Sequence, residues 1–187
     1  MLKDNWKDIF IMVLKFFAIY YLCYYFSLAI IGLSSKEGRY SYFISHYLNF
    51  IDWTRSSLMY GTKKLLSFFH IETFLVNKYY LKKIGGKGFT LVFECVGYGI
   101  MSFWTAFIFT MSGAWNRKII FWVLGMIIFW MLNVIRLSLF LVAINEGWPM
   151  PLGIDHHSWY NLITYSVMFL LIFIFEFKYN KRTHEKK

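Results

Sequence analysis

The chain has 187 residues, of which 58% are hydrophobic, 23% aromatic and only 16% charged. Soluble domains are usually about 45–50% apolar, so the composition excludes an ordinary soluble domain and predicts a single integral membrane domain over residues 1–187. The formal net charge is +10, but no nucleic-acid-binding motif accompanies it, and we expect a lipid bilayer with anionic headgroups to be the partner of this charge.

Four apolar segments are long enough, or just long enough, to cross a bilayer, which needs about 20 residues. The first contains Lys15, whose long side chain can reach the headgroups from near the basic end. It is longer than the apolar part of a signal peptide, and no small-x-small cleavage site follows it, so we expect a permanent anchor. The predicted fold is an all-α polytopic membrane protein with about four transmembrane helices. Their expected ranges are residues 9–33, 96–114, 119–144 and 159–177.

Residues 34–94 form the one extended polar stretch, and residues 47–69 within it have apolar side chains at helical spacing. This spacing fits a basic amphipathic helix at the membrane surface and a packed helix of a small outer subdomain equally well. One face is predicted to carry Ile51, Leu58, Leu65 and Phe69, and other faces Arg55, Lys63 and Lys64.

The end of this polar stretch leads into a cysteine. Residues 85–88 read Gly-Gly-Lys-Gly and predict a turn. They do not predict a phosphate-binding loop, because the strand–loop–helix context and the Ser or Thr of such a loop are missing. Residues 89–93 then predict a short strand that enters Cys95.

The distribution of basic residues predicts an orientation. Four spans place the amino terminus, the basic turn at residues 115–118 and the basic tail at residues 178–187 on one side of the membrane. The positive-inside rule assigns that side to the cytoplasm, and residues 145–157, which contain no Lys or Arg, to the outside. Residues 34–94 would also lie outside although they are basic, because the rule loses its force at a length near 60 residues.

Three polar residues at or within the spans then face the same outer side, and they can carry chemistry. Cys95 precedes the second span, where the positive end of a helix and a nearby cation favour a thiolate. Arg136 lies inside the third span, where a charge costs at least about 2.5 kcal/mol on insertion scales, so we expect it to contact a thiolate, a carboxylate or an oxyanion. Asn133 lies one turn deeper on the same face and can bond to it. His157 can remove or return a proton.

Two other classes of function stay open from the residues alone. In a non-catalytic membrane protein or transporter, Arg136 would be a structural charge paired with Glu94 or Asp155, although no internal repeat typical of a transporter is present. A metal-dependent membrane hydrolase would need a different set of ligands. Adjacent histidines rarely chelate one ion, and no HExxH motif is present. Its candidate ligands are Glu94, Asp155, His156 and His157.

The order of these residues resembles the exosortase/archaeosortase family of membrane cysteine transpeptidases. The resemblance covers roughly the carboxy-terminal half of the chain and is greatest to the short bacterial forms, such as the F-type exosortases. Val96 stands where a serine is common after the family's cysteine, and larger members have additional membrane helices. The motifs that carry the resemblance are Cys95-Val96-Gly97, Asn133-Val134-Ile135-Arg136 and His157-Ser158-Trp159-Tyr160.

The resemblance implies a protease or transpeptidase in a bacterial inner membrane, with its site on the outer face and no cofactor. Its substrate would be a membrane-anchored protein with a carboxy-terminal sorting signal, made of a short motif, a transmembrane helix and a basic tail. Cys95 would attack the scissile carbonyl, Arg136 would stabilise the developing anion, and His157 would protonate the leaving amine. His156 is the alternative to His157, which is preferred because the family's histidine tends to precede an aromatic residue by three with a small residue next, as Tyr160 and Asn161 follow His157.

Overall fold

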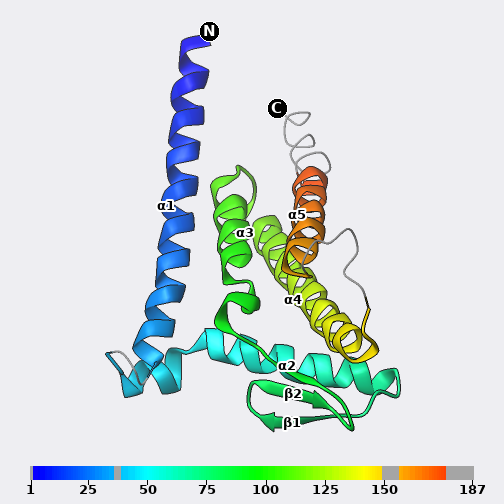
Figure 1. Cartoon of the computed structure of the whole chain (residues 1–187). Helices are drawn as coiled ribbons and strands as arrows, with labels where there is room; N and C mark the ends of the chain where they lie inside the picture. The colour runs from blue at the N-terminus through cyan, green and yellow to red at the C-terminus, as the bar shows by residue number, and fades with distance from the viewer. Residues whose placement is uncertain (1, 36–38, 149–155, 176–187) are drawn as a thin grey trace.

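The computed structural model describes residues 2–35, 39–148 and 156–175 (Figure 1). The chain is mostly helical, and a small antiparallel sheet lies between its second and third α-helices. A single helical turn, Ile44–Leu48, precedes the second α-helix. In chain order the α-helices are α1 (Leu2–Ser34), α2 (Phe50–Phe68), α3 (Tyr98–Thr110), α4 (Trp115–Glu146) and α5 (His156–Phe175).

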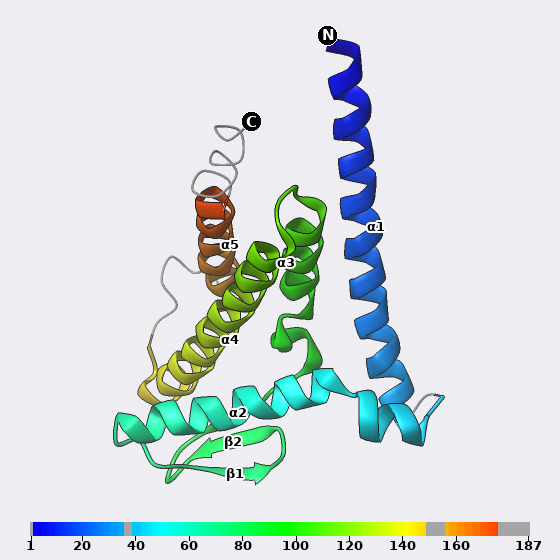
Figure 2. The ribbon, with the colours of Figure 1, turned by 180° about the vertical axis from the view of Figure 1, so that it is seen from behind.

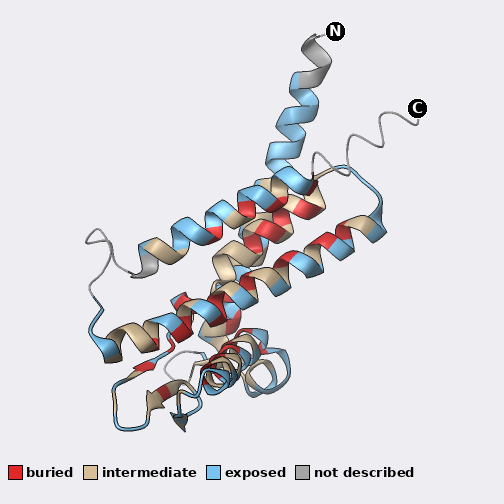
Figure 3. Ribbon diagram, turned by 90° about the vertical axis from the view of Figure 1, so that its right-hand side faces the viewer, coloured by how far each residue is buried: buried red, intermediate tan, exposed pale blue. Residues whose placement is uncertain are grey.

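Three helices in the described part of the chain are long and apolar enough to cross a membrane: Trp6–Ser34 of α1, α4, and Ser158–Phe175 of α5. They leave large apolar side chains uncovered, such as Leu22, which is 71% exposed. Figure 3 shows this exposure along the outer sides of the long helices, with burial where helices face one another. Apolar side chains on the outside of such helices suit a hydrocarbon environment. The structure is thus mostly helical and consistent with the predicted helical membrane protein, with three membrane-length helices in its described part where about four were expected.

The predicted span at residues 96–114 contains a shorter helix. α3 has 13 residues, which rise about 20 Å along the axis and do not match a hydrocarbon layer of about 30 Å. It begins after Gly97, whose φ of 85° is left-handed, and it ends at Met111, whose backbone is extended. The basic turn expected at residues 115–118 is also different, because α4 already begins at Trp115.

A close approach of two helices packs α3 against α4. Trp104 of α3 is fully buried, and its indole Nε1 donates to the carbonyl of Trp122 at 3.2 Å. A Cβ atom on Gly125 of α4 would lie 2.2 Å from that same Nε1. Glycine is therefore required at position 125, because only a residue without a side chain leaves room for the indole.

The polar segment folds into a small subdomain across one end of the helices. Figures 1 and 2, which view the molecule from opposite sides, both show α2 lying across the end opposite the amino terminus, with the sheet beyond it. The predicted turn at residues 85–88 joins two strands, with Gly85 at a φ of 71°. The strand predicted at residues 89–93 is shorter and starts earlier. The strands, in sheet order, are β1 (Thr73–Asn77), β2 (Tyr80–Lys83) and β3 (Gly88–Thr90).

The buried face of α2 differs from the predicted one. Arg55 was expected away from the apolar face, but it is only 7% exposed and lies on that face, whereas Phe69 is exposed. The prediction was wrong because residues three or four positions apart lie on the same face of a helix whatever their polarity, and Arg55 stands at this spacing from Ile51 and Leu58. The buried face packs against the sheet and α4, as expected for a packed helix of a subdomain. Its members are Ile51, Arg55, Leu58, Met59, Thr62 and Leu66.

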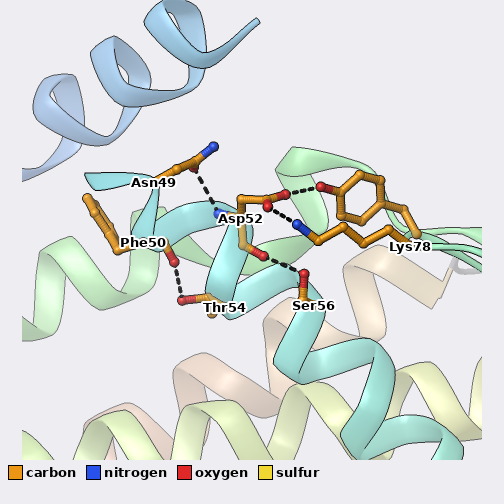
Figure 4. Close-up of polar contacts among 7 residues, drawn as sticks. Asn49, Phe50, Asp52, Thr54, Ser56 and Lys78 are labelled. Atoms are coloured by element: carbon orange, nitrogen blue, oxygen red, sulfur yellow. Dashed lines mark hydrogen bonds and ion pairs between the residues drawn. The ribbon is translucent and has the colours of Figure 1, made fainter. Parts of the chain in front are cut away.

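Polar contacts fix the first turn of α2 to the β1–β2 hairpin. The side chain of Asn49 caps the helix by accepting from the backbone N–H of Asp52 at 3.1 Å. The Asp52 carboxylate in turn accepts from the Lys78 ammonium and the Tyr79 hydroxyl, both on the hairpin (Figure 4). A carboxylate in the first turn also interacts favourably with the positive end of the helix. The hairpin therefore has a defined position on α2.

Candidate active site

Cys95 lies in a tight turn between the sheet and α3. The turn is a short 3₁₀-helix, Phe93–Val96, closed by a bond from the backbone N–H of Cys95 to the carbonyl of Val92 at 3.1 Å. Cys95 is a free thiol and is 8% exposed. The sequence placed Cys95 at the start of a helix, but α3 begins three residues later at Tyr98, after the left-handed Gly97. The effect of a helix end falls off within one turn, so a side-chain cation has to stabilise a thiolate here.

Asn133 of α4 holds this turn in place. Its side chain is 1% exposed, and its amide Nδ2 donates to the carbonyl of Cys95 at 2.9 Å and to that of Val96 at 3.2 Å. Its Oδ1 accepts from Arg136 Nη1 at 3.5 Å. The predicted contact between Asn133 and Arg136 is thus a long one, and the shorter bonds of Asn133 fix the backbone of the cysteine.

Arg136 of α4 reaches the thiol. Its Nη2 donates to Cys95 Sγ at 3.2 Å, across 41 positions of sequence. Its guanidinium also stacks on Tyr160 of α5, with Cζ 4.4 Å from the ring centroid. A guanidinium over an aromatic face is a favourable cation–π contact. The structure therefore brings Cys95, Asn133 and Arg136 together, as the sequence predicted, and adds Tyr160 as the residue that supports the arginine.

The two predicted histidines open α5, which begins at His156. The side chains of His156 and His157 lie outside the described residues, and so does Asp155. Tyr160 follows His157 by three positions, less than one turn along α5, and it contacts Arg136. The second turn of α5, which contains Tyr160, therefore lies beside the cysteine–arginine pair.

Arg55 is a component of the site region that the sequence interpretation missed. Its Nε donates to the carbonyl of Leu91 at 2.7 Å, and its Nη2 donates to the same oxygen. The guanidinium carbon lies 3.6 Å from the ring centroid of Tyr79 and 4.5 Å from that of Phe93. Burial lowers the pKa of Arg55 from its ordinary value. The sequence signal that could have predicted its burial is its helical spacing with Ile51 and Leu58, which places all three residues on one face.

Two cavities meet at Arg136. One has a volume of about 280 Å³, lies between α4 and α5, and has nearly all apolar walls, including Ile135 and Trp159. The other has a volume of about 240 Å³ and lies between the strand segment before the cysteine and α4. Arg136 and Phe140 line both. The lining of the second is Phe89, Thr90, Leu91, Val92, Cys95, Arg136, Leu137 and Phe140.

Within the described part of the chain, no three His, Cys, Asp or Glu side chains group closely enough to hold a metal ion. Of the candidate ligands of the metal-hydrolase alternative, Asp155 and the side chains of His156 and His157 lie outside the described part. What the described site offers is a thiol next to a permanent cation. A guanidinium does not deprotonate at physiological pH, so it can stabilise a thiolate or an oxyanion throughout a reaction.

Comparison with protein-family models, with curated proteins and with solved structures finds no match to this chain. The chemistry of the site therefore has to be inferred from its own side chains and from the resemblance of its motifs.

Proposed function

We propose that the chain is a membrane-embedded cysteine protease or transpeptidase that cleaves a peptide bond next to the membrane segment of an anchored protein. The observation that carries the proposal is the 3.2 Å contact to Cys95 Sγ from Nη2 of Arg136, a residue within the membrane-length helix α4. A buried thiol alone is chemically inert, and a charge alone on a membrane-length helix is costly. Together they form an activated nucleophile.

The reaction divides between these side chains. The Cys95 thiolate attacks the scissile carbonyl, a C–S bond forms, and the carbonyl electron pair moves to oxygen. Arg136, which can donate several hydrogen bonds, stabilises the thiolate first and the oxyanion next. When the oxyanion collapses, the C–N bond breaks, the amine takes a proton, and a thioester remains on Cys95. The family resemblance assigns that proton to His157.

The second half of the reaction releases the product. An acceptor amine or a water molecule attacks the thioester and gives up a proton, which the resemblance assigns to the neutral His157; the C–S bond breaks, and the Cys95 thiolate returns. An amine makes the protein a transpeptidase, and water makes it a simple protease. The substrate class follows from the resemblance: an exported protein whose carboxy terminus carries a short motif, an apolar helix and a basic tail. The site would face the outside of a bacterial inner membrane.

The deciding experiment compares the two cysteines, because Cys23 on α1 is a matched control far along the chain. The substrate is a reporter fused to a three-part carboxy-terminal end taken from a protein of the same genome. Cys95→Ala should abolish processing and Cys23→Ala should preserve it. EDTA should leave the rate unchanged. Loss of activity with EDTA that added zinc restores would favour the metal-dependent hydrolase instead.

A second measurement needs no substrate. Alkylation by iodoacetamide near pH 7 reports the thiolate fraction and the access of each cysteine separately. Cys95 in the Cys23→Ala variant should react faster than Cys23 in the Cys95→Ala variant. Equal rates would show that Arg136 does not activate the thiol of Cys95.

A further inference from the structure

The β3 strand lies at the edge of the sheet in the described part of the chain, because the strand order is β1-β2-β3. Its pairing shows which main-chain groups face β2. The N–H of Leu91 donates to the carbonyl of Tyr79, the carbonyl of Lys87 accepts from the N–H of Lys83, and Phe89 is paired with Leu81, so these odd-numbered residues have main-chain groups that face the hairpin. Main-chain groups alternate in direction along a strand. Those of Thr90 and the N–H of Val92 therefore face away from the sheet.

This outer edge borders the cavity that contains the thiol. Thr90 and Val92 both line the 240 Å³ cavity together with Cys95 and Arg136. Val92 is 45% exposed, and its carbonyl accepts the N–H of Cys95. An extended polypeptide beside these two residues would therefore reach the nucleophile within a few residues.

We infer that the outer edge of β3 is the docking site for the extended segment of the substrate, which adds to the sheet as a fourth strand. Main-chain pairing provides the affinity in this mode of recognition, and alternate side chains enter the adjoining pocket. The inference rests on the proposed function and deepens it, because it assigns the way in which the scissile segment is held.

The 280 Å³ cavity between α4 and α5 determines which residues can come after that segment. It shares Arg136 and Phe140 with the cavity that contains the thiol, and its walls between α4 and α5 are almost wholly apolar. A polypeptide that leaves the β3 edge past Arg136 therefore meets apolar surface. The occupant that fits both cavities has an extended stretch joined directly to apolar residues, which is the chemistry of a membrane-anchored protein at the start of its membrane segment.

The test uses disulfide trapping at Cys95 in the Cys23→Ala protein, because strand pairing needs no knowledge of a motif. The probe is the peptide Thr-Val-Thr-Val-Thr, whose carboxy terminus forms an amide with the amine of cysteamine and which is supplied as its disulfide. The disulfide of cysteamine without a peptide is the reference. The concentration of 2-mercaptoethanol that releases half of the label, read by intact mass, measures the gain from the peptide. We expect a gain of roughly tenfold, as two or three main-chain hydrogen bonds would give.

Two sets of variants distinguish main-chain pairing from non-specific hydrophobic binding of the peptide. N-methylation at alternate amides of the peptide should remove the gain, and methylation at the amides between them should preserve it. On the protein, Val92→Pro should also remove the gain, since proline lacks the N–H. Its fixed φ near −65° is close to the −88° of Val92, so the backbone should tolerate the change. Val92→Ala keeps the N–H and should keep the gain.

The inference would be overturned if the peptide probe and cysteamine were released at the same concentration of 2-mercaptoethanol. It would also be overturned if every N-methyl group had the same effect. Equal behaviour of the Val92→Pro and Val92→Ala proteins would overturn it as well. If Val92→Pro instead dissociates a dimer in detergent without changing the trapping, the edge belongs to a second copy of the chain. Trapping requires no processing, so a negative result leaves the proposed protease activity standing. An inactive protease would likewise leave a positive trapping result standing.

Discussion

Arg55 of α2 donates to the carbonyl of Leu91, 36 positions later, with an Nε–O distance of 2.7 Å. The guanidinium is held between the rings of Tyr79 and Phe93, so its own position is fixed. Leu91 lies four residues before Cys95. The cysteine turn is therefore held from the subdomain side by Arg55 and from the α4 side by Asn133, which binds the carbonyl of Cys95 itself.

Arg55→Lys should loosen this turn although it keeps the positive charge. Lysine cannot reproduce the planar stacking or the paired donors, and a buried carbonyl left without its donor costs about 1–3 kcal/mol. We expect a lower thermal midpoint in detergent and a changed rate of Cys95 alkylation. Lys64→Met on the same helix, at an exposed position, is the control and should change neither. An unaltered midpoint and alkylation rate in Arg55→Lys would show that Leu91 does not depend on Arg55.

Gly97→Ala tests the turn from its other end. Gly97 has a φ of 85°, and a side chain in this left-handed region costs roughly 1–2 kcal/mol. The added Cβ would have only ordinary contacts, the closest at 3.6 Å, so the cost is conformational. Gly99→Ala, two residues on and inside α3, should instead be neutral or stabilising by up to about 1 kcal/mol. Denaturation of both variants in detergent measures the difference, and equal stabilities would contradict the backbone argument.

The contacts of Asp52 predict a loss of stability at alkaline pH. A hydrogen bond from Lys78 to Asp52 raises the pKa of that lysine from its ordinary 10.5. Burial, and then the bond to Asp52, raises the pKa of Tyr79 from its ordinary 10.0. A raised folded-state pKa gives stability that is complete below the unfolded value and is lost as the pH rises through the folded value. The wild-type midpoint should therefore fall more steeply above about pH 10 than that of Asp52→Asn. Parallel curves from pH 8 to 11 would refute this.

The arrangement of the helices predicts which regions lie on opposite sides of the membrane. The α3–α4 turn lies at the same end as the amino terminus, and α2 lies at the other end (Figure 1). In protein without its native cysteines, Lys64→Cys should react with an impermeant maleimide on intact cells. Asn116→Cys, which is also exposed, should react only after the cells are opened. The reverse pattern would place the site on the cytoplasmic side.

Much of the candidate site could be predicted because polar residues are few in the apolar part of the chain. Asn133 and Arg136 stand out in the apolar run that forms α4, and Cys95 ends the polar segment, so their proximity followed from the order of the spans. The start of α3 could not be predicted in the same way. The apolar run begins at Val96, but the left-handed Gly97 separates Cys95 from the helix, and hydrophobicity alone carries no signal of backbone conformation.

Arg55 shows a different limit of sequence interpretation. A charged residue at a helical spacing with apolar ones is normally assigned to the solvent side, because burial of a charge is costly. Here the cost is offset by the Leu91 carbonyl and the rings of Tyr79 and Phe93, which come from the segment after β3, a hairpin and a turn elsewhere in the chain. Only the tertiary structure brings these partners together, so the pattern of α2 alone could not reveal them.

Arg136→Lys separates a catalytic arginine from a structural one. Lysine keeps a positive charge on α4, so the variant should insert and fold nearly normally, but it loses the fork that reaches Cys95 Sγ and stacks on Tyr160. Removal of one oxyanion donor typically lowers turnover roughly 10²–10³-fold, and we expect a loss of this size in processing of the reporter, with a thermal midpoint close to that of the wild type. Arg117→Lys, near the other end of α4, is the matched control and should retain full activity. If Arg136 only pairs with a structural partner, Arg136→Lys will process the reporter at the normal rate, and the arginine then leaves the catalytic set.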